Sequence, residues 1–306
     1  MTTVIYDLRA NPITFDFCAF LASTFILFRA RGESSFDLAV IATGFRNVTP
    51  REKSYTIEDR LWRLNNLISP VARACVPVRN FSIIRSQSDV NNSFASDTHP
   101  PGFNFAMPLP ANYSPRLVSD LYKRTRIIPC IFNSTASARS AVAARFARGN
   151  RALITLSPRL ASHDQSRNSQ LAQWFSLYEL LAKSGYQVVV IPDLDDALGD
   201  RFIWNYPWPI FEAAAFSLDI RIAVLQAAEN NVISSGGMGA IATYSSASYV
   251  ICNVLHESNH VANADYFRNF VGLEVGSQYP WVTNRQRFDW GLFEAERIAK
   301  QYIYGN

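Results

Sequence analysis

The amino-acid sequence predicts an α/β protein built from two Rossmann-like parallel-sheet domains that face a cleft. Short apolar runs that are typical of strands alternate with helical runs along both halves of the chain, which is the pattern that parallel sheets leave in a sequence. The 306 residues are enough for two domains of ordinary size, and 48% apolar and 18% charged residues are typical of a globular protein.

The first domain is expected over residues 1–135. Apolar runs predict its strands at 4–8, 37–43 and 81–84. The apolar run 17–28 has 12 residues, which is too few to span a bilayer, so we expect a buried first helix there.

Four further segments are predicted ahead of the second domain. Apolar residues at helical spacing predict a helix over 59–73, which Pro70 should end or kink. Residues 87–115 are polar and rich in proline, and predict a long surface loop. Residues 113–131 predict one more helix and strand, and the composition of 133–150 favours a short helical crossover.

The second domain is expected over residues 150–306, where the alternation is cleaner. Strands are predicted at 152–156, 187–191, 232–234 and 248–253. Helices are predicted at 170–184, at 219–230 with Asp219 as its N-cap, and from about 240. Gly185 follows the first of these helices as the expected C-terminal stop.

Charge and cysteine usage narrow the function classes. The four cysteines lie far apart with no CxxC pair, so neither a zinc site nor a disulfide framework is predicted. With no basic leader before the first apolar run, a cytoplasmic protein is expected. Nine Lys or Arg against one acid between Arg116 and Arg159 indicate an anionic partner or a solvated face, but few aromatic residues accompany them, so nucleic acid is not expected.

The strand before Ser235 breaks into a glycine-rich turn, Ser-Ser-Gly-Gly-Met-Gly, which precedes a predicted helix. Glycines there could take positive φ and let backbone N–H groups approach an anion, which predicts that Ser235, Gly236 and Gly237 bind a phosphate. Tight strand-to-helix packing is the steric alternative.

Several side chains should share the sheet edge with this turn, because ligands bind outside the carboxyl ends of parallel strands. Arg159 follows the first strand of the second domain, and its planar guanidinium suits a phosphate. Arg167 and Asn168 lie in the next loop as donors for a diphosphate or a sugar, and Asp193 follows the neighbouring strand.

Two features of this half have competing interpretations. Arg221 could face the ligand or form a structural salt bridge. Asp193, Asp195 and Asp196 form a DxD string that could coordinate a divalent metal, but an acidic turn explains it as well, and we expect neither a metal nor a cofactor.

A general base is sought in the first domain. Asp7 directly follows the first predicted strand, and Asp16 precedes the first predicted helix. Either carboxylate could deprotonate an acceptor hydroxyl across the cleft, while Asp16 could instead serve as the N-terminal charge of its helix.

Residues 152–281 resemble bacterial sugar-transfer proteins of the two-Rossmann-domain, GT-B type that are encoded with surface-polysaccharide functions. The segments that carry the resemblance are ITLSPR, SRNS, LLAKSGYQVVVIPD, LDIRIAVLQAAENNVISSGGMGA and GSQYPWV. The resemblance implies that the second domain holds a nucleotide-sugar donor, that the first faces the acceptor, and that a last helix over 289–302 returns to the first domain.

The combined interpretation is a metal-independent glycosyltransferase that moves a sugar from a nucleotide-sugar to a saccharide or lipid-linked acceptor hydroxyl. A lipid-linked acceptor would bring the protein to the surface of the inner membrane. Two alternatives stay open: a nucleotide-sugar hydrolase or epimerase, and a non-catalytic protein that binds a nucleotide-sugar or glycan. The sequence lacks a recognisable donor signature, so the sugar, the nucleotide and the stereochemical outcome are undetermined.

Overall fold

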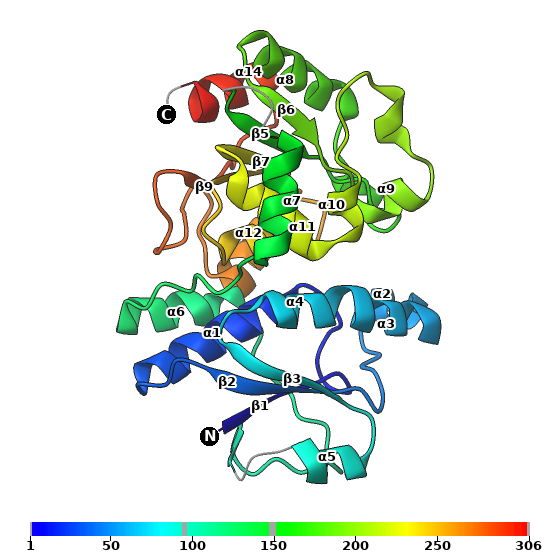
Figure 1. The fold of residues 1–306 in the computed structure, drawn as a ribbon, viewed down its shortest axis with the longest axis vertical. Helices are drawn as coiled ribbons and strands as arrows, with labels where there is room; N and C mark the ends of the chain where they lie inside the picture. The colour runs from blue at the N-terminus through cyan, green and yellow to red at the C-terminus, as the bar shows by residue number, and fades with distance from the viewer. Residues whose placement is uncertain (1, 94–96, 147–150, 305–306) are drawn as a thin grey trace. The chain divides into compact units, whose positions relative to one another are not determined.

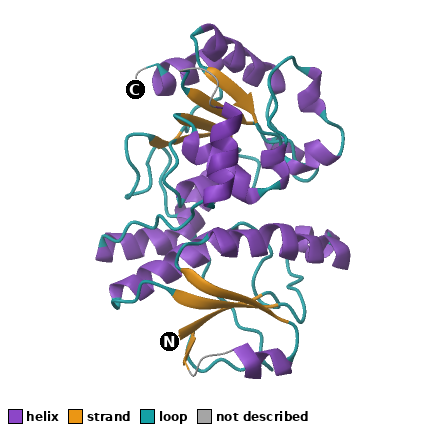
Figure 2. Cartoon of the chain, viewed as in Figure 1, coloured by secondary structure: helices purple, strands orange, loops and turns teal. Residues whose placement is uncertain are grey.

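The computed structural model describes residues 2–93, 97–146 and 151–304, and its contacts divide the chain into two compact units, Met1–Phe132 and Asn133–Asn306. Each unit holds one sheet in which every pairing between neighbouring strands is parallel (Figure 1, Figure 2). The predicted α/β class with two parallel sheets is therefore confirmed. The division falls before the crossover helix α7 (Ala136–Phe146), which belongs to the second unit.

The sheet of the first unit has the strand order β3-β2-β1-β4. Its strands are β1 (Thr2–Asp7), β2 (Phe36–Ile41), β3 (Val78–Ile84) and β4 (Asp97–His99). Its helices are α1 (Asp16–Ala30), α2 (Pro50–Ser54), α3 (Ile57–Arg63), α4 (Ser69–Ala74), α5 (Gln87–Ser93) and α6 (Pro115–Thr125). Helices α1, α4 and α6 cover one face of this sheet, while α5 and the loop through Phe105 cover the other.

Helix α1 is the buried first helix that the sequence predicts. Ten of its residues are buried, and the rings of Tyr6 on β1 and Phe17 on α1 lie 4.7 Å apart. Among the described residues, no helix combines the length and apolar character that crossing a bilayer requires.

The predicted long loop over 87–115 is wrong in part. It contains helix α5, whose start is held by Asp89 accepting from the backbone N–H groups of Arg85 and Ser86, and it contains β4, which pairs with β1. A three-residue edge strand is too short to leave an alternating pattern, so it cannot be predicted from the sequence.

The predicted helix over 59–73 is continuous in outline but changes its winding. A π-helical turn, Leu64–Ile68, joins α3 to α4, and the hydroxyl of Ser69 donates to the carbonyl oxygen of Leu64 at 2.8 Å. Pro70 lies in the first turn of α4, where a missing N–H costs little. The helical path therefore continues to Ala74 instead of ending at the proline.

The sheet of the second unit has the strand order β6-β5-β7-β8-β9. Its strands are β5 (Leu153–Ser157), β6 (Gln187–Val190), β7 (Asn230–Ser234), β8 (Tyr249–Cys252) and β9 (Gln286–Phe288). Besides α7, its helices are α8 (Leu171–Lys183), α9 (Leu194–Leu198), α10 (Ala213–Phe216), α11 (Leu218–Ala227), α12 (Gly237–Thr243), α13 (Ala264–Tyr266) and α14 (Ala295–Ile298). The chain runs from β5 to β6 and then returns to the other side of β5 as β7, so the order reverses between β5 and β7.

Two hydrophobic clusters cover the two faces of this sheet. One packs α8 and the C-terminal helical segment against β5, β7 and β8, with Trp174 buried at its centre. The other packs α7 and α11 against the opposite face. The helix predicted over 289–302 is shorter than expected, because α14 starts at Ala295 and continues as a π-helical turn, Ala299–Ile303. Its described packing is on α8, within its own unit.

Two helix boundaries test the predicted caps. Gly185 follows α8 with φ at +90°, as predicted for a helix stop. The prediction that Asp219 caps α11 is wrong: Ser217 is the N-cap and accepts from the N–H of Ile220. The Asp219 carboxylate instead accepts from the backbone and hydroxyl of Thr135, which ties α11 to the start of α7.

Candidate functional site

The candidate site lies at the carboxyl ends of β5 and β7, where the strand order reverses. Open parallel sheets bind ligands at such a point because the loops on either side diverge there. The loop after β5 carries Arg159 and Arg167, and the glycine turn follows β7. We call the residues of this loop and turn the sheet-edge site.

Arg159 is the internal brace of the loop and not the exposed phosphate ligand that we expected. The residue is only 7% exposed. Its guanidinium donates to the carbonyl oxygens of His163 and Asp164, both at 3.0 Å, and to Asn168 Oδ1 at 2.6 Å. Because these bonds hold the loop in its shape, removing the side chain would disturb the loop itself.

Asn168 is committed to the same loop. Besides accepting from Arg159, its Oδ1 accepts from the N–H of Ala161, and its Nδ2 donates to the Ala161 carbonyl, both at 3.0 Å. The predicted role of Asn168 as a donor to a sugar or diphosphate therefore finds no support in its hydrogen bonding. It stabilises the loop beside Arg159.

Arg167 differs, because its guanidinium is held loosely over the glycine turn. Its Nη2 lies 3.3 Å from the carbonyl oxygen and 3.4 Å from the hydroxyl of Ser235, and its Nη1 lies 3.4 Å from Asp164. Its Nε is buried and has no hydrogen-bond partner among the described residues. A cation with long contacts and an unsatisfied donor is placed to bind an anion.

The glycine turn does not use the positive φ angles that we predicted for it. Gly236 has φ 176°, which is extended backbone open to any residue, and neither Gly237 nor Gly239 has a positive φ. Gly239 is needed for packing, because a Cβ there would lie 3.2 Å from Ile251 Cδ1 on β8. The steric interpretation is therefore correct for Gly239.

The rest of the turn remains open to a ligand. Gly236 is exposed, and within the described chain the N–H groups of Gly236 and Gly237 donate to no other residue. Helix α12 has seven residues, so its dipole contributes little. What the turn could offer an anion is therefore its unpaired amides and the adjacent Arg167.

Asp193 and Arg221 form a charged pair beneath the same edge. Burial raises the pKa of Asp193 and lowers that of Arg221 to about 10, while the attraction between the two charges opposes both shifts. Asp193 accepts from the N–H of Leu160, and Arg221, only 6% exposed, donates to the Pro192 carbonyl at 2.8 Å. Arg221 thus supports the end of β6 through a carbonyl oxygen. Among the described residues it forms no salt bridge within 4 Å, and its Nε is buried without a hydrogen-bond partner.

The three acids of the DxD string hold two backbone segments, the loop after β5 and the start of the turn at Phe202. Asp195 accepts from Ser162 at 2.9 Å, and Asp196 accepts from the N–H of Phe202 at 2.8 Å, while Asp193 binds Leu160. Over the described part of the chain, no three His, Cys, Asp or Glu side chains gather closely enough to hold a metal ion.

His256 belongs to this site, although we gave it no role from the sequence. It lies in the loop after β8, and its Nε2 is buried without a partner among the described residues. Burial lowers the pKa of His256, and the positive charge of Arg167 lowers it further. The same loop is joined to the Arg167 loop by Asn259, which donates to Asp164 at 2.6 Å. No local pattern marked His256, because folding alone brings it here.

In the first unit, Asp7 is a structural anchor. It is fully buried, and its carboxylate accepts from Arg9 Nη2 at 2.7 Å, from Arg9 Nε at 2.9 Å and from the N–H of Leu109 at 2.9 Å. Arg9 also donates to the Phe105 carbonyl at 2.7 Å. The pair fastens the loop that covers the sheet, and leaves the Asp7 carboxylate poorly suited to take a proton from a substrate.

Asp16 has the properties of a base more clearly. It begins α1, and its Oδ2 accepts one side-chain hydrogen bond, from the Thr14 hydroxyl at 2.6 Å. Burial raises the pKa of Asp16, and the Thr14 bond and the charges of Arg51 and Arg46 oppose this rise. A carboxylate with a raised pKa is a better proton acceptor near neutral pH. Asp16 also lies at the start of α1, where its charge favours the helix, and this position is compatible with a role as proton acceptor.

No protein-family model matches the sequence, and no curated protein matches it. Distant likenesses exist among solved structures. E. coli ADP-heptose lps heptosyltransferase II is 12% identical over 87% of this chain and 88% of its own, with a TM-score of 0.45. The glycosyl transferase family 9 protein from Veillonella parvula DSM 2008 is 8% identical over 82% and 79%, with 0.46. E. coli heptosyltransferase WaaC with ADP is 11% identical over 100% and 99%, with 0.45. Likeness at this level does not identify a substrate, so the site is argued from this chain's own residues.

Proposed function

We propose that the protein is a glycosyltransferase that binds the diphosphate of a nucleotide-sugar at the sheet-edge site and transfers the sugar to a saccharide or lipid-linked acceptor hydroxyl. One observation carries the proposal. Arg167 keeps a buried nitrogen without a partner beside the unpaired amides of the glycine turn, and His256, whose pKa its charge lowers, keeps another in the loop after β8.

These groups suit the chemistry of a leaving diphosphate. Negative charge builds on the diphosphate as the glycosidic bond to the sugar breaks, and donors already in place stabilise that charge. Arg167 would supply a fixed positive charge, Gly236 and Gly237 would supply N–H donors, and His256 would donate a hydrogen bond from Nε2. Since the charge is met by these side chains and amides, we propose that the reaction proceeds without a metal ion.

The acceptor hydroxyl must lose a proton as it forms the new bond to the sugar. We propose Asp16 of the first unit as the base, because its raised pKa and single side-chain hydrogen bond leave it able to accept a proton. Asp7, whose oxygens are already engaged, is not part of this proposal. The protein would act in the cytoplasm, at the surface of the inner membrane if the acceptor is lipid-linked.

Binding is tested first with a panel of nucleoside diphosphates and their sugars, by thermal shift with and without EDTA and by calorimetry of the hits. Replacing Arg167 with Gln should weaken binding of the best hit by about tenfold or more, because one charge-assisted contact is lost. The matched control is Arg268→Gln, an exposed arginine paired with Asp265 and Glu274. Equal affinity in the wild type and Arg167→Gln would rule out this site, and loss of binding in EDTA would refute metal independence.

Turnover separates the remaining alternatives. A transferase consumes the bound nucleotide-sugar only when an acceptor is added, whereas a hydrolase or epimerase turns it over alone. Asp16→Asn should lower the transfer rate by about 10²-fold or more without changing donor affinity. Binding with no turnover under either condition, across a panel of acceptors, would instead identify a non-catalytic binding protein.

A further inference from the structure

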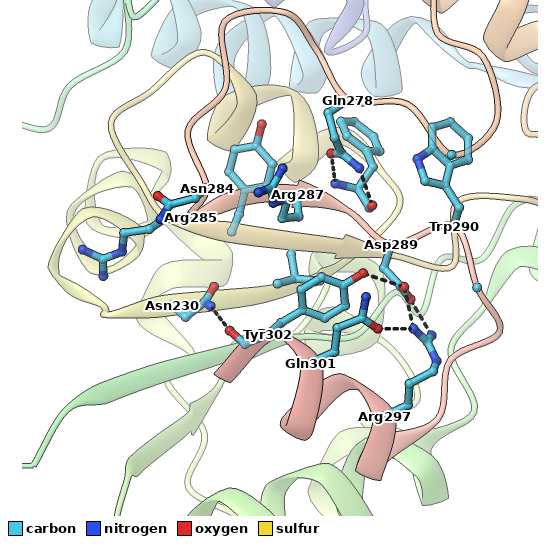
Figure 3. A pocket seen from close by; sticks show the side chains of 15 residues that line it. Asn230, Gln278, Asn284, Arg285, Arg287, Asp289, Trp290, Arg297, Gln301 and Tyr302 are labelled. Carbon is cyan, nitrogen blue, oxygen red and sulfur yellow. Dashed lines mark hydrogen bonds and ion pairs between the residues drawn. The ribbon is translucent and has the colours of Figure 1, made fainter. Parts of the chain in front are cut away.

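A pocket of about 670 Å³ runs along β9, the edge strand of the second sheet (Figure 3). Its walls come from β9 and the segments on either side of it, from residues of β7 and β8, and from α14 and the helical turn after it, so it shares no residue with the sheet-edge site. Its size lies within the range of about 300–1,000 Å³ that is usual for small-molecule sites.

One wall of the pocket is rigid and electrically neutral. Asp289, 2% exposed, accepts from Arg297 Nη1 and Nη2 at 2.7 Å each, and from the Tyr302 hydroxyl at 3.1 Å (Figure 3). Burial and the negative charge of Asp289 raise the pKa of Tyr302 to about 12, so its hydroxyl stays protonated as a donor. Arg297 therefore offers no free charge to a ligand.

The backbone N–H and carbonyl groups of Phe288 on β9 are also occupied. The amide of Gln278 donates to the Phe288 carbonyl at 2.8 Å and accepts from the Phe288 N–H at 2.6 Å, which replaces the bonds that another strand would make. Addition of a partner strand at this edge is thereby blocked. What the pocket offers is its side chains.

Those side chains leave an excess of positive charge. Asp289 is the only acid among the described residues that line the pocket, and Arg297 neutralises it. The guanidinium of Arg285 donates to the backbone carbonyl oxygen of Glu229. This acceptor is uncharged, so it does not neutralise the positive charge of Arg285. Arg287 is half-buried at the centre of β9, and its guanidinium makes no hydrogen bond, ion pair or ring contact with any described residue.

The position of Arg287 makes this absence informative. It lies in register with Val250 of the sheet's core, and its side chain is half-buried where it lines the pocket. The guanidinium nitrogens are not buried against the protein, so they can donate to a ligand in the pocket. An anionic ligand would accept these hydrogen bonds.

The neighbours of Arg287 indicate what else the ligand carries. Asn284 makes no hydrogen bond with a described residue, and of the Gln301 amide only Oε1 is used, accepting from Arg297 at 3.3 Å. Side-chain amides both donate and accept, which suits hydroxyl groups. Trp290 and Tyr302 add aromatic surface to the same lining.

We propose that the pocket along β9 binds a small anionic sugar, one that carries a carboxylate or a phosphate, with Arg287 as its main anion ligand. Arg285 contributes longer-range attraction, and Asn284 and Gln301 bind the sugar hydroxyls. This site is independent of the proposed transferase function, since no residue is shared with the sheet-edge site.

The test uses the full chain and calorimetric titration with glucuronic acid, glucose 1-phosphate and uncharged glucose. The wild type should bind one or both anions and show far weaker affinity for glucose. Arg287→Gln should weaken anion binding by about tenfold or more, and Arg287→Lys by less, because the charge is kept. Comparing the two anions tells whether a carboxylate or a phosphate is preferred.

Two control variants and one further test variant show where the anion binds. Arg201→Gln, an exposed arginine near the opposite sheet edge, and Arg167→Gln should both leave glucuronic acid binding unchanged. Asn284→Ala, at an exposed position, should weaken binding by a few-fold and serves if Arg287→Gln fails to fold. The proposal is overturned if no anion binds the folded wild type, if Arg287→Gln binds as well as the wild type, or if the loss follows Arg167→Gln instead.

Discussion

Similar residue types lie at the carboxyl ends of the two sheets, but their polar atoms are hydrogen-bonded in one case and unpaired in the other. In the first unit, Asp7 and Arg9 bind each other and also the backbone at Leu109 and Phe105, which fastens the loop through Phe105. In the second unit, Arg167 and His256 each keep a buried nitrogen without a partner in the described structure. We infer from this comparison that a charged residue after a strand is a candidate ligand-binding residue where the fold leaves its polar atoms unpaired.

The same contrast exists inside the sheet-edge site. Arg159 and Arg167 lie in one loop, yet Arg159 makes three short bonds to that loop while Arg167 makes only contacts of 3.3–3.4 Å. One arginine builds the loop and the other is presented by it. We therefore expect variants of the hydrogen-bonded residues to lose stability, and variants of the unpaired residues to lose ligand binding.

The largest effect is expected from Asp7→Asn, which removes one charge of a buried pair. Arg9 would stay largely buried without its partner, so the free energy of unfolding of the first unit should fall by about 3–5 kcal/mol. Urea denaturation followed by a probe in the first unit measures this loss. Asp16→Asn is the matched control and should change stability far less. A variant that keeps its stability but loses catalysis would return Asp7 to the list of candidate bases.

A smaller effect on stability is expected from Arg159→Gln. Three acceptors in the loop would lose a charged donor, and a loss of about 2 kcal/mol follows from the usual value of such bonds. Affinity for a nucleoside diphosphate should fall as well, because the loop that presents Arg167 is disturbed. Paired with the unchanged stability expected of Arg167→Gln, thermal and calorimetric measurements separate the two roles. If Arg159→Gln weakens binding at full stability, Arg159 is a direct ligand after all.

Much of the fold was predictable because long elements carry their own periodicity. Helices α1 and α8 and the inner strands β1, β2, β5 and β7 fall where the apolar runs placed them. The edge strands β4 and β9 have three residues each, and their pairing is decided by the neighbouring strand, so no local signal reveals them. The four-residue helix α10 was missed because it is too short to show a helical period, whereas the start of α9 fits the alternative in which the acidic string begins a helix.

The candidate site was predictable in place but not in detail. Strand ends and the glycine turn located the sheet edge, because that inference needs only the order of the elements. The different roles of Arg159 and Arg167 depend on which carbonyl groups the folded loop turns toward them, and the sequence contains no pattern for that. His256 follows a different strand and reaches Arg167 only through tertiary folding.

The smallest effect expected is a pH dependence from His256. In the free protein, burial and the charge of Arg167 lower the pKa of His256 below the usual value of about 6.5. A bound diphosphate would counter the charge of Arg167 and raise that pKa, so binding takes up a proton and affinity increases as pH falls below about 6.5. Without ligand, as pH falls, His256 takes up its proton in the unfolded chain at a higher pH than in the folded protein. The free energy of unfolding should therefore fall over the same pH range. Calorimetry and denaturation from pH 8 to 5 should show both trends. His256→Asn removes the titrating group while the ligand's own titration stays the same, and identical pH profiles for the two proteins would exclude His256 from the diphosphate site.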